Sequence, residues 1–372
     1  LINNKDYDFS RYNYFLANYF LQQNKYNEAK NLIVKSRKKS SSNLLLKQTE
    51  NYLINGKFEK AKSFFNCKNP KDSISEFFYI LANLYSSERD YKMSNFYLKI
   101  SLILNEKFIP NNTLLAENYY YQNKNELSKN IYFSLKLIGN KYSWYAAKSI
   151  AKIINIEEGE EDSVASLEKE FNLISNPNFE HFYELANFYK DYKYHKKAIK
   201  YYSLALENVE KNHPLIPKIL DRRGTSFEQI DQWKDAEQDL KASLNILPNQ
   251  AHVLNYLAYT WVDKGVNIDE GIKMLIKANQ IKEDDGYITD SLGWAYYAEE
   301  NYIKAEYYLQ KAVELLPFDP VITDHYADVL WMLNKKIQAR YFWKHAINIK
   351  NIKKELKDSV SKKIFFGIPE KL

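Results

Sequence analysis

The stretch Asp290 to Ala312 reads DSLGWAYYAEENYIKAEYYLQKA, and residues 324–346 read DHYADVLWMLNKKIQARYFWKHA. Small residues stand at Gly293, Ala305 and Ala312 in the first stretch, and alanine stands 34 residues after each of them in the second. Few other letters match between the two stretches. The fixed spacing of the small residues, rather than overall similarity, therefore defines a repeat of 34 residues.

The same rule can be followed upstream. A unit has a small residue, an aromatic residue or leucine three positions later, a second small residue about twelve positions after the first, and a bulky residue four further on. The pairs of small residues are Ala17/Ala29, Thr49/Ala61, Ala82/Ser94, Ala116/Ser128, Ala186/Ala198, Gly224/Ala236, Ala258/Gly271, Gly293/Ala305 and Ala327/Ala339. One more unit, near Ala147, does not fit the rule. Residues 10–353 thus hold about ten units.

The spacing within a unit predicts two short amphipathic helices joined by a tight turn, because residues three and four apart lie on one helix face. Small residues are expected where the two helices cross, since larger side chains would push the backbones apart. Pro248 and Pro317 follow second helices and cannot continue them. A single hairpin cannot bury its apolar face, so we expect the hairpins to stack into a continuous core.

This pattern resembles the tetratricopeptide repeat, whose signature is W-x2-L-G-x2-Y, then A-x3-F, then P. The best match runs from Thr289 through Leu292-Gly293 to Tyr296, continues with Ala305 and Leu309, and ends at Pro317. The resemblance implies an all-α fold, a right-handed superhelical solenoid of about ten helical hairpins. We expect one continuous solenoid, with divergent units over 1–178, regular units over 179–353, and a capping helix and tail over 354–372.

The phrase DDGYITDSLGWAYY (284–297) also resembles the multi-repeat proteins of alphaproteobacteria, which often carry a secretion signal. The chain begins at Leu1 inside an already helical pattern, so we expect an upstream segment of that kind. The single cysteine, Cys67, permits either the periplasm or the cytoplasm. We predict a bacterial protein that is periplasmic or envelope-associated, with the cytoplasm left open.

The common motifs of catalysis and phosphate binding are absent from the sequence. There is no G-x-x-x-x-G-K-[ST], no G-x-S-x-G and no H-E-x-x-H. His325 and His345 lie one hairpin apart with no third ligand at metal spacing, which favours structural roles. We predict no catalytic residue, no cofactor, no metal and no enzyme activity, but a scaffold or adaptor that binds proteins in envelope assembly. The alternative is the recognition arm of a larger enzyme, such as a glycosyltransferase, whose catalytic domain is absent here.

Charge is unevenly distributed along the chain. Residues 1–156 hold 24 Lys/Arg and 12 Asp/Glu, whereas residues 157–372 hold 29 and 35. The excess is either drift of a lysine-rich surface or a basic half that meets an acidic partner or a membrane surface. Nucleic acid is not expected as a partner, because the abundant aromatic residues fall on repeat core positions. No run of about 18 apolar residues predicts a transmembrane helix.

The resemblance implies that the first helix of each unit lines a concave groove. Carried over unit by unit, it selects Tyr183, Asn187, Asp221, Asn255, Tyr259, Asp290, Trp294, Tyr297, Asp324, Asp328 and Trp331. Relatives that clamp a terminal carboxylate use Lys, Arg and Asn there, so the aspartates favour a basic or neutral peptide segment. The last six residues should form one exposed surface with aromatic anchors. Alternatively, the aspartates cap or cross-link helices.

The C-terminal tail has its own pattern. Ile352, Leu356, Val360 and Ile364 recur at four-residue spacing among lysines. A solenoid needs its last apolar face covered, so a capping helix is the first interpretation. A peripheral, basic amphipathic contact with a membrane is the second.

Overall fold

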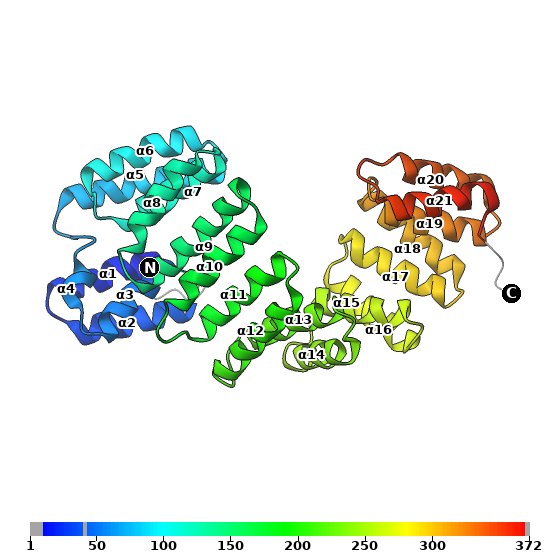
Figure 1. The fold of residues 1–372 in the computed structure, drawn as a ribbon, viewed down its shortest axis with the longest axis horizontal. Coiled ribbons are helices and arrows are strands. Elements are labelled where there is room, and N and C mark those ends of the chain that lie inside the picture. Colours follow the sequence, from blue (N-terminus) through cyan, green and yellow to red (C-terminus); the bar gives the residue numbers. More distant parts are fainter. Residues whose placement is uncertain (1–9, 40–42, 369–372) are drawn as a thin grey trace. The chain divides into compact units, whose positions relative to one another are not determined.

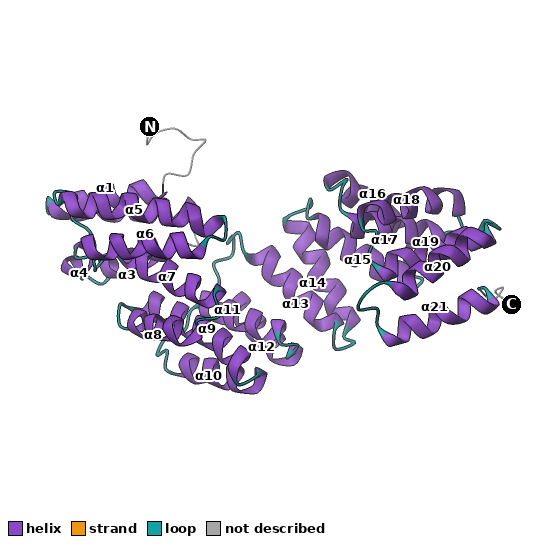
Figure 2. Cartoon of the chain, turned by 90° about the horizontal axis from the view of Figure 1, so that it is seen from above, coloured by secondary structure: helices purple, strands orange, loops and turns teal. Residues whose placement is uncertain are grey.

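The computed structural model describes residues 10–39 and 43–368. Within these ranges the chain forms α-helices joined by short turns, and no strand occurs (Figure 2). It divides into two compact units, residues 1–176 (unit 1) and residues 177–372 (unit 2). The predicted all-α class is confirmed.

Unit 1 contains five helical hairpins (Figure 1). Their helices are α1 (Ser10–Gln22), α2 (Tyr26–Lys39), α3 (Leu44–Ile54), α4 (Phe58–Lys62), α5 (Pro70–Ser87), α6 (Tyr91–Leu104), α7 (Ile109–Tyr121), α8 (Asn125–Lys136), α9 (Asn140–Glu157) and α10 (Glu160–Asn172). The second hairpin is incomplete, because α4 has only five residues.

Unit 2 contains five further hairpins and a final single helix. Its helices are α11 (Phe179–Asp191), α12 (His195–Asn208), α13 (Ile216–Glu228), α14 (Trp233–Ile246), α15 (Ala251–Asp263), α16 (Ile268–Ile281), α17 (Gly286–Ala298), α18 (Tyr302–Leu315), α19 (Pro320–Met332), α20 (Lys336–Asn348) and α21 (Lys354–Phe366). The ten hairpins and the helix that follows them confirm the predicted repeat number and the capping helix.

Each hairpin turn among the described residues contains a residue with positive φ, and the turn reverses the chain within two to four residues. These residues are Asn24, Gly56, Arg89, Asn123, Gly159, Lys193, Asp231, Gly265, Glu300 and Asn334. In the turn between α17 and α18, the amide of Asn301 donates to the carbonyl of Tyr296, at 2.9 Å. Such bonds satisfy carbonyl groups that the helix end leaves without a partner.

Small residues do lie at the helix crossings. In the hairpin of α7 and α8, the Ser128 hydroxyl donates to the carbonyl of Ala116, at 2.8 Å. Ser163 donates to Ala151 at 2.6 Å between α9 and α10. The unit near Ala147 therefore has a regular register, based on Ala151 and Ser163, and treating it as degenerate was wrong. With 18 residues, α9 is longer than a usual first helix, so Ala147 lies one turn before the crossing.

Unit 1 departs from a linear stack, in which each repeat contacts only its neighbours. The side chain of Gln48 in α3 accepts from the amide of Lys141 in α9, at 3.0 Å. Arg11 in α1 pairs with Glu76 in α5, and its guanidinium lies 4.3 Å from the centroid of the Tyr79 ring. The first two hairpins thus fold back onto the first helices of later hairpins.

Unit 2 is a linear stack, in which each second helix contacts the first helix of the next hairpin. The last helix, α21, packs on α20 and buries Val360 completely, with Leu356 and Ile364 against the same core. Three of the four apolar residues of the tail row, Leu356, Val360 and Ile364, therefore pack against the last hairpins, as expected of a cap. Among the described residues, no helix is both long enough and apolar enough to cross a bilayer.

Candidate peptide-binding groove

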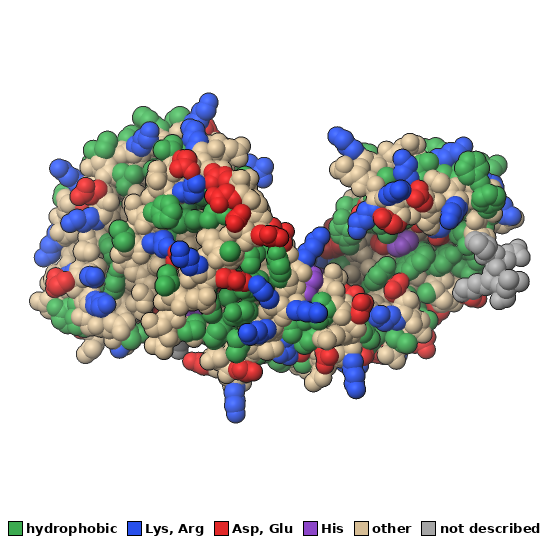
Figure 3. Space-filling view, in the orientation of Figure 1, with side chains coloured by type: hydrophobic (Ala, Val, Ile, Leu, Met, Phe, Trp, Pro, Cys, Tyr) green, Lys and Arg blue, Asp and Glu red, His purple; other side chains and the backbone are tan. Residues whose placement is uncertain are grey.

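All eleven predicted groove residues lie on the first helices of unit 2, from α11 to α19. Figure 3 shows hydrophobic side chains gathered on the hollowed face of this unit, between charged rims. Three polar links join successive first helices, each between residues 35 apart. Asn187 accepts from Arg222, Asp290 bonds to His325, and Asp328 accepts from Lys363. The predicted residues therefore lie in one row along successive first helices. The 34-residue spacing predicts this row but not the polar contacts between residues 35 apart.

The C-terminal end of this row is closed by α21. Lys363 lies 2.9 Å from the carboxylate of Asp324 and 2.6 Å from that of Asp328, and Trp343 donates its indole N–H to Asp328. Asp324 and Asp328 are each only 5% exposed. The predicted exposed acidic surface is thus wrong at these two positions, because a lysine from the capping helix neutralises and covers them.

Trp331 is also enclosed by the cap. A side-chain carbon placed on Gly367, just after α21, would lie 2.0 Å from the Trp331 ring. The Arg340 guanidinium lies 5.0 Å from the centroid of the same ring. This tryptophan serves as a packing surface for the tail rather than as an open anchor.

Asp290, 7% exposed, is the third buried aspartate and bonds to His325 Nδ1 at 2.9 Å. The Trp294 ring stacks on His325 with centroids 4.0 Å apart, and on Tyr297 with centroids 4.6 Å apart. Burial lowers the pKa of His325. The carboxylates of Asp290 and Asp324 raise it by more than burial lowers it, so the pKa of His325 lies above its ordinary value. Trp294 and Tyr297 stay half-buried, as part of a rigid three-ring stack.

The remainder of the row, on α11, α13 and α15, is open. Tyr183, Asn187 and Tyr259 are half-buried. One carboxylate oxygen of Asp221 and the amide oxygen of Asn255 are buried, and neither has a hydrogen-bond partner within the described residues. These two acceptors lie 34 residues apart, at equivalent places on adjacent first helices. Buried acceptors are rarely left unsatisfied, so we expect a water molecule or another donor beside each of these two oxygens.

The electrostatics of this open part come from both signs of charge. Burial raises the pKa of Asp221, against the lowering influence of His252, Lys190 and Arg222. Burial and the charge of Asp290 raise the pKa of Tyr259 to about 12. The sequence analysis did not connect Arg222 or Lys363 with this row, and it gave His325 a structural role without naming Asp290 as its partner. A search for opposite charges 35 residues apart would have found His325 next to Asp290 and Lys363 next to Asp328.

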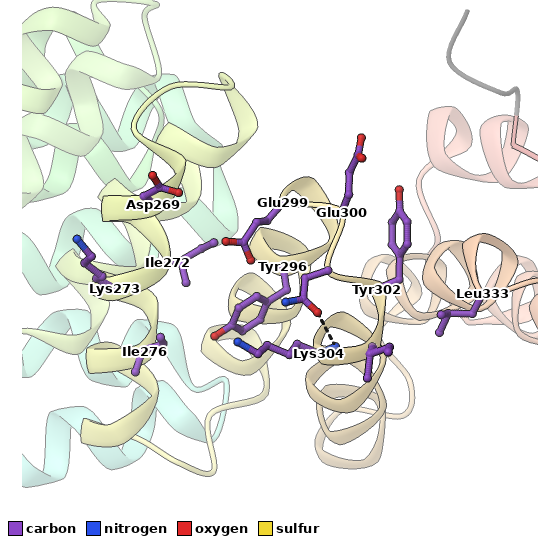
Figure 4. A pocket seen from close by; sticks show the side chains of 12 residues that line it. Asp269, Ile272, Lys273, Ile276, Tyr296, Glu299, Glu300, Tyr302, Lys304 and Leu333 are labelled. Carbon is purple, nitrogen blue, oxygen red and sulfur yellow. Dashed lines mark hydrogen bonds between the residues drawn. The ribbon is translucent and has the colours of Figure 1, made fainter.

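A separate depression of about 990 Å³ opens at the turn edge of unit 2 (Figure 4). It is lined by charges of both signs, including Asp269, Lys273, Glu299 and Lys304, beside the ring of Tyr296. It contains none of the eleven predicted residues. Its mixed lining matches no particular ligand chemistry, so it is not the candidate site.

Comparisons with known proteins concern the repeat. No family model matches the sequence. A TPR repeat-containing protein of Pseudomonas aeruginosa is 30% identical over 113 residues, which is 30% of this chain and 19% of the relative. The match therefore spans about a fifth of that relative's length.

Among solved structures, MamA of Desulfovibrio magneticus is 17% identical, with a TM-score of 0.42 over 50% of this chain and 98% of MamA. YrrB, described as a TPR protein with an unusual peptide-binding site, is 20% identical, with a TM-score of 0.37 over 46% of this chain and 86% of YrrB. PilF of Pseudomonas aeruginosa is 16% identical, with a TM-score of 0.42 over 50% of this chain and 91% of PilF.

The hairpins of this chain are tetratricopeptide repeats. Their paired helices cross at small residues twelve apart, and their register repeats every 34 or 35 residues through most of the chain. The 113-residue match to a TPR protein agrees with this assignment.

Proposed function

We propose that this protein is a non-catalytic scaffold whose unit 2 binds an extended peptide segment across α11, α13 and α15. Two facts support the proposal: tetratricopeptide hairpins present a row of first helices, and the Asp221 and Asn255 oxygens in that row are buried without a donor. An unpaired buried acceptor costs about 1–3 kcal/mol. A partner whose binding shifts the side chains around these oxygens and supplies two donors removes that cost.

The expected partner carries Lys or Arg, or offers backbone N–H groups, near a hydrophobic side chain. Asp221 supplies a carboxylate, and Asn255 supplies an amide that can pair with a peptide backbone. Tyr259 on α15 and Trp294 on α17 supply aromatic surface further along the row. The groove is therefore proposed to end at the three-ring stack of Trp294, with α19 covered by α21 rather than open to the partner.

The experiment compares the wild type with an Asp221→Ala, Asn255→Ala double variant in a pull-down from the source organism. The proposal expects that one set of partners is lost and that the melting temperature of the free protein is unchanged or raised. If Asp221 and Asn255 served only to stabilise the fold, the double variant would keep its partners and would have a lower melting temperature. Identical partner sets for the two proteins would refute groove binding.

We propose further that the protein works in the bacterial envelope, facing the periplasm. The support is the resemblance of residues 284–297 to proteins that often carry a secretion signal. Fractionation of the source cells tests this, with antibodies to this protein and to marker proteins. Recovery with the periplasmic marker supports the proposal, and recovery with the cytoplasmic marker refutes it.

A further inference from the structure

In a stacked hairpin, the first helix presents one face to the preceding hairpin. In α17 that face includes Ile288, five residues before the small residue Gly293, and Ala295, two residues after it; both are buried. The corresponding residues of α19, Ile322 and Val329, are also buried. In both places a second helix, α16 or α18, supplies the cover.

The same face of α5 is uncovered. Its equivalents are Phe77, five residues before Ala82, and Leu84, two residues after it; they are 57% and 58% exposed. The preceding hairpin does not cover them, because α4 is a single short turn and α3 and α4 pack against α1, α2 and α9 instead. Figure 1 places α5 and α6 at one edge of unit 1.

A continuous run of aromatic rings crosses from α5 to α6 on this edge. Ring centroids are 5.7 Å apart for Phe77 and Phe78, 6.0 Å for Phe78 and Tyr97, and 5.4 Å for Tyr97 and Phe96. Phe96 is 55% exposed. Together with Leu84, these four rings form what we call the open stacking face. Exposed apolar surface of this continuity is typical of interaction sites.

Lysines flank the open stacking face. Lys92 and Lys99 lie one turn before and one turn after Phe96 on α6, and both are exposed. Neither forms an ion pair within the described residues. Residues 1–156 also hold twice as many basic as acidic residues, 24 against 12. A partner for this face should therefore carry negative charge beside its apolar side chains.

We propose that the open stacking face binds an acidic amphipathic helix of a partner protein, which takes the place of the missing second helix. The occupant is helical because helices such as α16 cover the equivalents of Phe77 and Leu84 in unit 2. Phe96, whose equivalent Tyr307 is 65% exposed, extends the surface beyond that contact. A second copy docked face to face by a two-fold axis would bring Lys92 and Lys99 of both copies together, which like-charge repulsion opposes. This site is separate from the proposed groove, and its test does not depend on it.

The probe is a peptide of residues 159–174 of this chain. It carries five carboxylates and one lysine, and in its own hairpin its apolar row of Val164, Leu167 and Phe171 is buried. The control peptide has lysine in place of the five acidic residues. Fluorescence anisotropy measures binding of each labelled peptide to the full chain.

The proposal expects the acidic peptide to bind at least tenfold more tightly than the control peptide. It also expects a loss of at least tenfold in the Phe77→Ser, Phe96→Ser variant. An Ile303→Ser, Tyr307→Ser variant, altered at exposed positions on α18, should bind like the wild type. Circular dichroism shows that each variant is folded.

Several results overturn the proposal. No binding of the acidic peptide, or equal binding of both peptides, removes the acidic helix as occupant. Sedimentation that shows a dimer lost in the Phe77→Ser, Phe96→Ser variant assigns the face to a second copy. Binding to anionic vesicles that is lost in the same variant assigns it to a membrane surface.

Discussion

Gly293 shows why small residues recur every 34 positions. A side-chain carbon added there would lie 2.6 Å from Cγ of Leu309 and 3.0 Å from the Leu309 backbone nitrogen. Ala305 and Ala312 in the same unit are completely buried, and so are Ala327, Ala339 and Ala346 in the next. The close approach of two helix backbones therefore explains why small residues recur at these positions while the other residues vary.

Gly293→Leu should overpack this crossing and lower the free energy of unfolding by about 1–3 kcal/mol. Urea denaturation followed by tryptophan fluorescence measures the change. The control is Tyr287→Leu, an exposed position on the same helix, which should have little effect. An unchanged midpoint for Gly293→Leu would mean that the crossing is not at this residue.

The buried cluster around Lys363 makes stability depend on pH. Burial and the neighbouring Asp324 raise the pKa of Asp328 to about 6, from an ordinary value of 3.8, even though Lys363 opposes the shift. The folded state therefore holds a proton that the unfolded state releases between about pH 4 and pH 6. Stability from this group is present below the unfolded pKa and is lost as pH rises through the folded pKa.

Asp328→Asn should remove this pH dependence. The free energy of unfolding of the variant, relative to the wild type, should rise by about 1–3 kcal/mol between pH 4 and pH 7, since one pKa unit corresponds to about 1.4 kcal/mol. Urea titrations at several pH values give the difference. Asp358→Asn, at an exposed position of α21, serves as the control and should show a flat difference. A flat difference for Asp328→Asn as well would contradict the assignment.

The conformational free energy that the hairpin turn costs in the folded state varies from unit to unit. A left-handed residue occurs in every hairpin turn that the structure describes, but the sequence puts glycine there in some units and a long side chain such as Lys193 in others. An L-residue in this region is less stable than glycine by about 1–2 kcal/mol. The sequence could not locate these turns by composition, because the chain has only nine glycines.

Lys193→Gly should therefore raise the free energy of unfolding of unit 2 by up to about 1 kcal/mol, because Lys193 has φ of 61°. Gly265→Ala should lower it by about 1 kcal/mol, since Gly265 has φ of 67° and open space around it. Thermal melts of the two variants measure the changes. Melting temperatures that shift in the same direction in both variants would refute the conclusion that positive φ favours glycine in these turns.

The capping helix α21 acts as an additional first helix in the repeat register. Its Lys363 stands 35 residues after Asp328, as His325 stands 35 after Asp290. Lys363→Met would leave two carboxylates buried without a cation, and should cost about 3 kcal/mol. Lys357→Met, at an exposed position of the same helix, should be nearly neutral. Equal urea unfolding midpoints for the two variants would show that Lys363 does not stabilise the fold.

At the scale of the whole molecule, periodicity predicted the helical class, the ten hairpins and the row of first helices. It could not predict that three of the aspartates are buried, because their partners His325 and Lys363 come from the next first helix and from the cap. Nor could it predict the fold of unit 1. The contact of Gln48 with Lys141 joins residues 93 apart, which no nearest-neighbour repeat rule contains.

The central claim is that a partner binds in the open groove of unit 2. Photo-cross-linking in the source cells tests it, with p-benzoylphenylalanine placed either at Tyr259, one turn after Asn255, or at Tyr307, exposed on α18. We predict adducts at position 259 with a segment that contains Lys or Arg, lost in the Asp221→Ala, Asn255→Ala background. Adducts at position 307 with none at 259, or adducts at 259 that survive the double substitution, would contradict the account.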